Sequence, residues 1–143
     1  MLKETISYVD YDGNERTEDH YFNITKAELL DLETKDPDGW GEKLMEIVRT
    51  KDTTNLIKVM KELVLFAYGE KSSDGRKFIK VDKDGHRLAD DFVQTEAYSE
   101  FYMSLLIDAK KASDFFNAVI PDISELVEKA KANKEIATIT ASN

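Results

Sequence analysis

The sequence predicts an α+β fold that is mostly α-helical, with an N-terminal β-hairpin packed on about five or six helices. Apolar residues on both sides of Asp12-Gly13-Asn14 predict the hairpin, because these turn residues tolerate the positive φ angles that tight turns require. Apolar residues at spacings of three and four recur over much of the remaining chain and predict helices.

Two segments within the first 24 residues are expected to form the strands of the hairpin. Residues 5–11 contain Ile6, Tyr8 and Val9, and residues 16–24 contain Tyr21, Phe22 and Ile24. A lone hairpin is only marginally stable in water. We therefore expect its apolar side to pack on the helical part of the chain.

The next two helices are predicted from their ends. Thr25-Lys26-Ala27-Glu28 fits a capping box and begins a helix over residues 26–35. Asp36-Pro37-Asp38-Gly39 ends that helix, because the residue before a proline disfavours helical angles. Trp40 opens a second helix that runs to about residue 50, with apolar residues at Leu44, Ile47 and Val48.

The strongest helical pattern follows Asp52 or Thr53, either of which can cap a helix. Gly69 is well placed to stop this helix at its C-terminal end. The main apolar stripe consists of Leu56, Met60, Leu63 and Ala67, and it is widened by Val59, Leu65 and Phe66. An apolar arc this wide predicts a helix at the centre of the fold.

Residues 70–87 form the least regular stretch and are expected to be a loop or a second small hairpin. Helical patterning returns over residues 88–93, continues after a Thr95 cap to residue 106, and resumes after an Asp108 cap until Pro121. A capping box at residues 122–125 predicts one more helix. We expect a single domain over residues 1–132 and a frayed polar tail over residues 133–143.

Composition excludes several classes of protein. The chain has 143 residues, no cysteine, and 29 acidic against 20 basic residues, for a formal charge of −9. Disulfide scaffolds and cysteine-based zinc sites are therefore excluded. We expect no membrane span and no secretion signal, because the apolar runs are short and the N-terminus lacks an apolar core, and so we expect a cytoplasmic protein. The acidic charge also opposes binding to nucleic acid or to anionic membranes.

Charge is distributed unevenly along the chain. Residues 1–24 and residues 82–100 each contain two bases and six acids. Residues 69–81 are basic, because they contain Lys71, Arg76, Lys77 and Lys80 against two acids. This basic stretch is either a solvated loop or a contact for an acidic partner, and it lacks the interleaved aromatic residues typical of nucleic-acid binding.

Catalytic and metal-binding patterns are weak. Asp82, Asp84 and Gly85 match part of a calcium-binding loop, but Lys80 would then occupy the first ligand position, which requires a carboxylate. The Asp-Gly pairs are better explained as turns. His20 and His86 have no second histidine at helical spacing, and no Gly-x-Ser-x-Gly motif occurs. We therefore expect no catalytic residue, no metal site and no cofactor.

Aromatic residues are the remaining candidates for a binding role. Helices rich in aromatic and aliphatic residues suit a protein that binds other chains, although packing in a core is the better explanation for most of these residues, Trp40 included. The candidate partner-binding residues are Trp40, Phe66, Tyr68, Phe101, Tyr102, Phe115 and Phe116.

Several stretches, taken together, resemble a family of tail assembly chaperones encoded by long-tailed phages and prophages of Gram-positive bacteria. They are residues 6–19 (ISYVDYDGNERTED), 21–29 (YFNITKAEL), 67–72 (AYGEKS), 74–80 (DGRKFIK), 92–100 (FVQTEAYSE) and 115–121 (FFNAVIP). None of these stretches is a catalytic signature, so the resemblance rests on their occurring together and in order.

The resemblance implies a non-enzymatic protein that binds and solubilises the tape measure protein and recruits tail tube subunits. It also implies a location in the host bacterial cytoplasm and absence from the mature virion. We further expect the chain to form homo-oligomers. The −9 charge suits such a role, because it keeps a complex of apolar chains soluble. Two alternatives remain: an acidic regulator or DNA mimic that binds a basic protein surface, and a small structural component of the virion.

Overall fold

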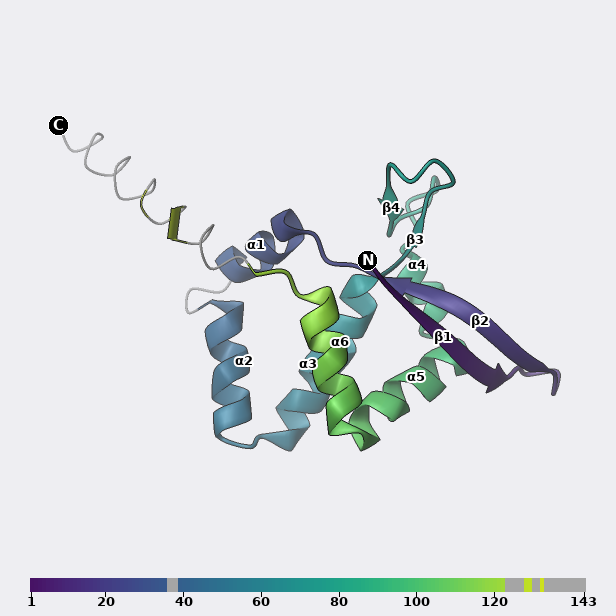
Figure 1. The fold of residues 1–143 in the computed structure, drawn as a ribbon, viewed down its shortest axis with the longest axis horizontal. Helices are drawn as coiled ribbons and strands as arrows, with labels where there is room; N and C mark the ends of the chain where they lie inside the picture. Colours follow the sequence, from purple (N-terminus) through teal and green to yellow (C-terminus); the bar gives the residue numbers. More distant parts are fainter. Residues whose placement is uncertain (36–38, 123–127, 130–131, 133–143) are drawn as a thin grey trace.

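The computed structural model describes residues 1–35, 39–122, 128–129 and 132, and leaves out the side chains at positions 44, 45, 47 and 48. It confirms the predicted α+β class, with an N-terminal hairpin in a four-stranded antiparallel sheet and helices packed beside it (Figure 1). The described elements are β1 (Leu2–Val9), β2 (Glu15–Phe22), α1 (Lys26–Lys35), α2 (Trp40–Arg49), α3 (Thr53–Ala67), β3 (Tyr68–Lys71), β4 (Phe78–Ile79), α4 (Leu88–Phe92), α5 (Glu96–Ile107) and α6 (Ala109–Val119).

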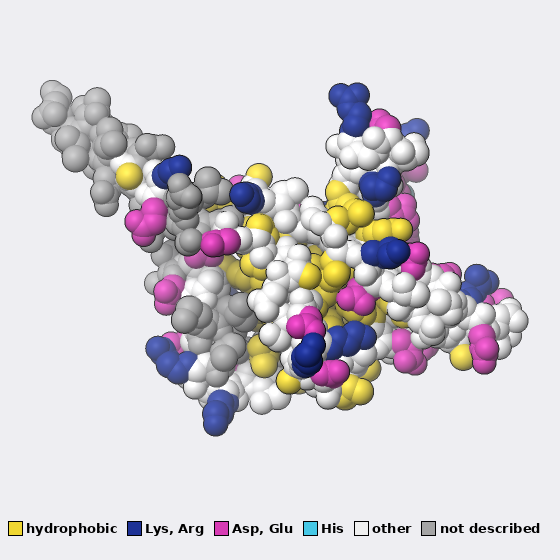
Figure 2. Space-filling model, viewed as in Figure 1, with side chains coloured by type: hydrophobic (Ala, Val, Ile, Leu, Met, Phe, Trp, Pro, Cys, Tyr) yellow, Lys and Arg dark blue, Asp and Glu magenta, His cyan; other side chains and the backbone are white. Residues whose placement is uncertain are grey.

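The sheet has the strand order β1-β2-β3-β4. The hairpin strands pair without interruption from Leu2 opposite Phe22 to Val9 opposite Glu15. Strands β3 and β4 form a second, shorter hairpin, so of the two predictions for residues 70–87 the small hairpin is confirmed. We call residues 68–79 the β3–β4 arm; it projects from the body of the molecule and carries Lys and Arg side chains, whereas acidic side chains line the β1–β2 hairpin (Figure 2).

Two Asp-Gly turns, one between β1 and β2 and one after β4, share one construction. Asp10 Oδ1 accepts hydrogen bonds from the N–H groups of residues 12 and 14, at 2.9 Å each. Asp82 Oδ1 does the same for residues 84 and 86, also at 2.9 Å each. A glycine at positive φ follows in both turns, Gly13 at 84° and Gly85 at 85°. The prediction that these Asp-Gly pairs form turns is therefore confirmed.

The hydrophobic core is built around Phe22, the last residue of β2, which is fully buried. Its ring lies 5.0 Å from that of Phe101 on α5 and 5.5 Å from that of Phe115 on α6. The rings of Tyr68 and Phe92 also lie within 6.0 Å of it. The hairpin thus packs on the helices through its apolar face, as expected for a two-stranded ribbon that is unstable alone.

The predicted helix starts are confirmed by their caps. Thr25 and Glu28 form the reciprocal capping box, with distances of 2.9 and 3.1 Å between side-chain oxygen and backbone nitrogen. Asp52 accepts from the N–H of Asn55, and Thr95 from that of Tyr98. Asp108 accepts from two N–H groups at the start of α6. These side chains accept hydrogen bonds from N–H groups in the first turn of each helix, which have no acceptor within the helix itself.

Gly69 does not stop α3 in the predicted way. The helix ends at Ala67 because Tyr68 is already extended, with φ −64° and ψ 139°, and pairs with Phe22 of β2. Gly69 is the second residue of β3, and its φ is not positive. A Cβ atom at this position would lie 2.5 Å from the Phe78 ring and 2.6 Å from the Ile79 carbonyl oxygen. The missing side chain therefore permits close strand packing.

Some expectations fall outside the described residues. The helix predicted to follow residues 122–125 is described only at residues 128, 129 and 132, which are helical. The predicted tail, residues 133–143, lies wholly outside. No helix within the described ranges is long and apolar enough to cross a membrane.

Candidate binding pocket

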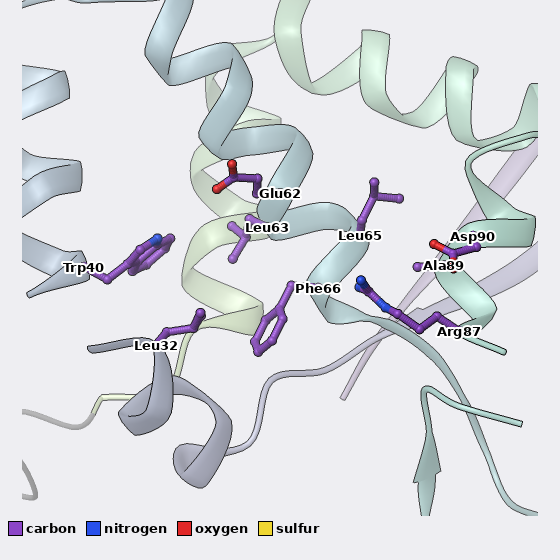
Figure 3. Close-up of a pocket in the computed structure, with 9 residues that line it drawn as sticks. All are labelled: Leu32, Trp40, Glu62, Leu63, Leu65, Phe66, Arg87, Ala89 and Asp90. Carbon is purple, nitrogen blue, oxygen red and sulfur yellow. The ribbon is translucent and has the colours of Figure 1, made fainter. Parts of the chain in front are cut away.

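A pocket of about 260 Å³ opens between α1, α2, α3 and α4 (Figure 3). Leu32 and Trp40 line one side, and the segment 87–90 lines the other. Helix α3 forms the wall between them. The apolar lining residues are Leu32, Trp40, Leu63, Leu65, Phe66 and Ala89, and the charged ones are Glu62, Arg87 and Asp90. The lining suits an apolar side chain with charged groups beside it.

Helix α3 contributes its second apolar face to the pocket. Leu63 is buried in the core, whereas Leu65 and Phe66 are only partly buried. Leu65 and Phe66 are among the residues that widen the apolar arc of this helix beyond the stripe that packs in the core. A wide arc lets one helix contact the core on one side and line a pocket on the other.

The position of Trp40 is set by the connection between α1 and α2. Gly39 has a φ of 82°, which turns the chain directly before Trp40. Glu33 on α1 accepts a hydrogen bond from the N–H of Gly41 at 3.0 Å, so its carboxylate caps the start of α2. The indole, in the first residue of α2, is therefore placed by a side chain of α1.

An ion pair that joins distant parts of the chain packs against the Phe66 ring. Lys80 Nζ lies 4.7 Å from the centre of the Phe66 ring and 2.7 Å from Glu28 Oε2. Burial lowers the pKa of Lys80, and the opposing effect of Glu28 does not fully compensate. Burial alone would raise the pKa of Glu28, but hydrogen bonds from Lys80 and Thr25 hold it below its ordinary value. The pair thus ties α1 to the segment that follows β4, beside the pocket.

The pocket rim carries charges that are available to a ligand. Glu62, Arg87 and Asp90 are exposed, and within the described part of the chain none of the three makes an ion pair. Two acids and one base surround the opening. A partner segment could therefore bring charged groups of either sign, with a surplus of acid on the side of this protein.

Two of the seven candidate partner-binding residues, Trp40 and Phe66, line the pocket. Phe101 and Phe115 are each 2% exposed and pack against Phe22. Phe116 is partly buried against the same core.

Two candidate tyrosines lie at other places in the fold. Tyr68 stacks on Phe92 with ring centres 4.0 Å apart, and burial raises its pKa to about 12. Tyr102 donates a hydrogen bond to the carbonyl oxygen of Ile57 at 3.0 Å, which joins α5 to α3. Neither residue lines the pocket.

The two histidines have structural surroundings. His20 lies between Glu18, 3.3 Å from its Nε2, and the Tyr68 hydroxyl, 3.2 Å from its Nδ1. His86 lies with Asp82 and Asp84 in an exposed turn, where one ligand atom of each lies within 4.8 Å of the others. The Asp82 carboxylate there already accepts two backbone hydrogen bonds that close the turn.

Sequence reasoning missed most of the pocket. Leu63 and Leu65 were expected only as apolar residues of a helix, and residues 88–90 only as part of a helix over residues 88–93. The wide apolar arc of α3 was the available signal, because it shows that the helix has apolar contacts on more than one side. Which residues face the pocket depends on how the helices pack together, and no local sequence pattern determines it.

Comparison with known proteins identifies the family. A family model described as phage tail assembly chaperone matches residues 1–142, and proteins of this family are not enzymes. Neither the curated proteins nor the solved structures gave a significant match. Because the family model covers almost the whole length, the chain belongs to the phage tail assembly chaperone family.

Proposed function

We propose that this protein binds and solubilises the tape measure protein and recruits tail tube subunits during tail morphogenesis, in a long-tailed phage or prophage of Gram-positive bacteria. The carrying observation is the family match over residues 1–142. In this proposal residues 1–132 act as one domain in the host bacterial cytoplasm, and the protein is absent from the mature virion.

The pocket supports a site for an apolar side chain of the tape measure protein. Sites for drug-sized ligands measure about 300–1,000 Å³, and this pocket, at about 260 Å³, is smaller. It suits one or two bulky side chains presented by a helix, in the manner of a helix bound in an apolar groove. Trp40 and Phe66, which face the same pocket, are the kind of aromatic residues that dominate binding energy at protein interfaces.

Co-expression tests the function. The tape measure protein encoded with this chain is produced with and without it, and the soluble fraction is measured by sedimentation and gel densitometry. We expect the tape measure protein to be soluble only when the chain is present. Equal insolubility in both cultures would contradict the proposal.

Variants test whether the pocket is the binding site. Trp40→Ala and Leu65→Gln are expected to weaken tape measure binding at least about tenfold, which corresponds to about 1.4 kcal/mol. Ile107→Gln is the matched control, because Ile107 is apolar, 81% exposed and outside the pocket. Circular dichroism checks that each variant folds. Folded pocket variants that bind as well as the control would remove the pocket from the proposal.

Salt separates this function from that of an acidic mimic. Burial of apolar side chains is insensitive to moderate salt, whereas binding through clustered carboxylates weakens because ions screen the charges. We expect tape measure binding to survive high salt. Binding that high salt abolishes would favour the acidic regulator instead.

A further inference from the structure

Basic side chains gather on the β3–β4 arm and the turn that follows it, although the chain as a whole is acidic. Residues 68–87 contain six basic and four acidic residues, whereas the rest of the chain contains fourteen and twenty-five. The arm projects from the body of the molecule, and Lys and Arg side chains lie along it (Figure 2). A charged ligand therefore meets a surface here whose sign is opposite to that of the rest of the protein.

Three basic residues of the arm are open to an acidic ligand. Lys71, Arg76 and Lys77 are exposed, and among the residues that the structure describes none of the three makes an ion pair. Lys71 Nζ donates to the carbonyl oxygen of Ser72 at 3.3 Å, which is a neutral acceptor. The planar guanidinium of Arg76 can bind one carboxylate through two parallel hydrogen bonds.

Hydrogen bonds order the backbone that carries these charges. The N–H of Ser72 donates to the carbonyl oxygen of Lys77 at 2.9 Å, and the Ser72 hydroxyl accepts from the N–H of Lys77 at 3.0 Å. Asp74, the acid of this turn, accepts from the Ser72 hydroxyl at 2.7 Å and from the N–H of Arg76 at 3.0 Å. Arg76 and Lys77 thus stand on a closed turn, which reduces the entropy lost when a ligand binds.

The surroundings favour a short acidic segment of a protein over a nucleic acid. Proteins that bind single strands stack the bases on exposed aromatic rings. Of the two aromatic residues of the arm, Tyr68 stacks on Phe92 at 4.0 Å, and Phe78 is half-buried with Lys80 Nζ 5.9 Å from its ring centre. A long polyanion would also reach the carboxylates of the body and be repelled. Because salt screens charges over about 8 Å, a short segment responds mainly to the arm.

We propose that the β3–β4 arm binds an acidic segment of a partner protein, a loop or tail in which several Asp or Glu residues follow closely in sequence. Arg76 binds one carboxylate with both arms of its guanidinium, and Lys71 and Lys77 attract the carboxylates beside it. All nine residues that line the pocket lie outside the arm, so the two sites use different residues. The arm site goes beyond the proposed function and does not depend on it.

Fluorescence anisotropy with a labelled oligoglutamate peptide tests the site. We expect binding at low ionic strength that weakens as salt is added. Arg76→Gln combined with Lys77→Gln should weaken binding at least about threefold, as expected when two solvent-exposed ion pairs are lost. Lys58→Gln combined with Lys61→Gln is the matched control, because it makes the same change in net charge at two exposed lysines of α3. Circular dichroism checks that each protein folds.

Two results of this experiment would overturn the proposal. One is a wild-type chain that does not bind the peptide at low salt. The other is a folded arm variant that binds the peptide as well as the α3 control does, because binding would then follow net charge and not the arm.

Nuclear magnetic resonance of the wild-type chain locates the site without any variant. On titration with the peptide, the backbone amide signals of residues 71–77 should shift, whereas those of the β1–β2 hairpin and α5 should not. Shifts that spare the arm would contradict the proposal. Tighter binding of an oligothymidine than of the peptide at equal salt would instead make a nucleic acid the occupant. Slower sedimentation of the arm variant than of wild type, without peptide, would make it the acidic hairpin of a second copy.

Discussion

Replacing Gly69 by alanine is expected to break the pairing of β4 with β3. The new Cβ atom would lie 2.5 Å from a ring carbon of Phe78 and 2.6 Å from the carbonyl oxygen of Ile79. The Phe78 ring can rotate away, but the Ile79 oxygen is backbone and moves only if β4 moves. Since β4 consists of two residues, Phe78 and Ile79, a shift of this size disrupts the whole β3–β4 pairing.

The size of the effect follows from the cost of overpacking. Inserting a methyl group where backbone cannot yield costs about 1–3 kcal/mol. For a chain of this length such a loss lowers the melting temperature by roughly 3–12 °C. Thermal unfolding followed by circular dichroism gives the shift, and hydrogen exchange of residues 68–79 locates it. We expect faster exchange in the β3–β4 arm and little change in α5 and α6.

Two further variants make the test specific. Gly41→Ala is the matched control, because its Cβ would meet Glu33 oxygens at an ordinary 3.6 Å within a helix. It should leave the protein unchanged or stabilise it by about 0.5–1 kcal/mol. Gly69→Asn would be tolerated if Gly69 were a left-handed helix stop, since asparagine adopts that conformation. A Gly69→Asn or Gly69→Ala protein as stable as wild type, with a protected arm, would refute the reasoning.

Three other predictions concern the core, the ion pair beside the pocket and a helix cap. Phe22→Ala should cost about 3–5 kcal/mol in urea unfolding, because the fully buried ring contacts four other rings; a loss below about 1 kcal/mol would contradict its central place. At pH above its ordinary value of 4.5, the lowered pKa of Glu28 adds to the free energy of unfolding, and this contribution is lost as pH falls through the folded value. Glu28→Gln should therefore make the free energy of unfolding depend less on pH in the acid range below 4.5. An unchanged acid profile would count against the pair with Lys80. Asp108→Ala should cost about 1 kcal/mol, since it leaves two N–H groups of α6 uncapped, and Asp114→Ala, which removes only an exposed partner of Lys110, should cost less.

Local signals predicted most of the elements. The capping box at Thr25 and Glu28 and the caps Asp52, Thr95 and Asp108 each depend on residues within one turn of the chain, and each forms as expected. The Asp-Gly turns are local in the same sense. A pattern that is complete within a few residues can be read without knowing the rest of the fold.

Features made by distant segments could not be predicted in this way. Gly69 follows an apolar helix, which is typical of a helix stop, but its place is decided by Phe78 and Ile79 of the facing strand. Trp40 and Phe66 were named as candidates among seven aromatic residues, but only the packing of α1 to α4 shows that these two share a pocket. The ion pair of Lys80 with Glu28 joins residues 52 positions apart, and no local spacing in the sequence predicts it.

The position of Phe22 has a consequence for the chain during its own synthesis. Phe115, whose ring packs against Phe22 in the core, lies 93 positions after it in the chain. At about 5–20 residues per second, a ribosome needs roughly 5–20 s to make that segment. During this interval the hairpin can form, but its apolar face and its free edge both remain in water. During its own synthesis, this member of a chaperone family therefore passes through a stage in which it is itself prone to aggregate.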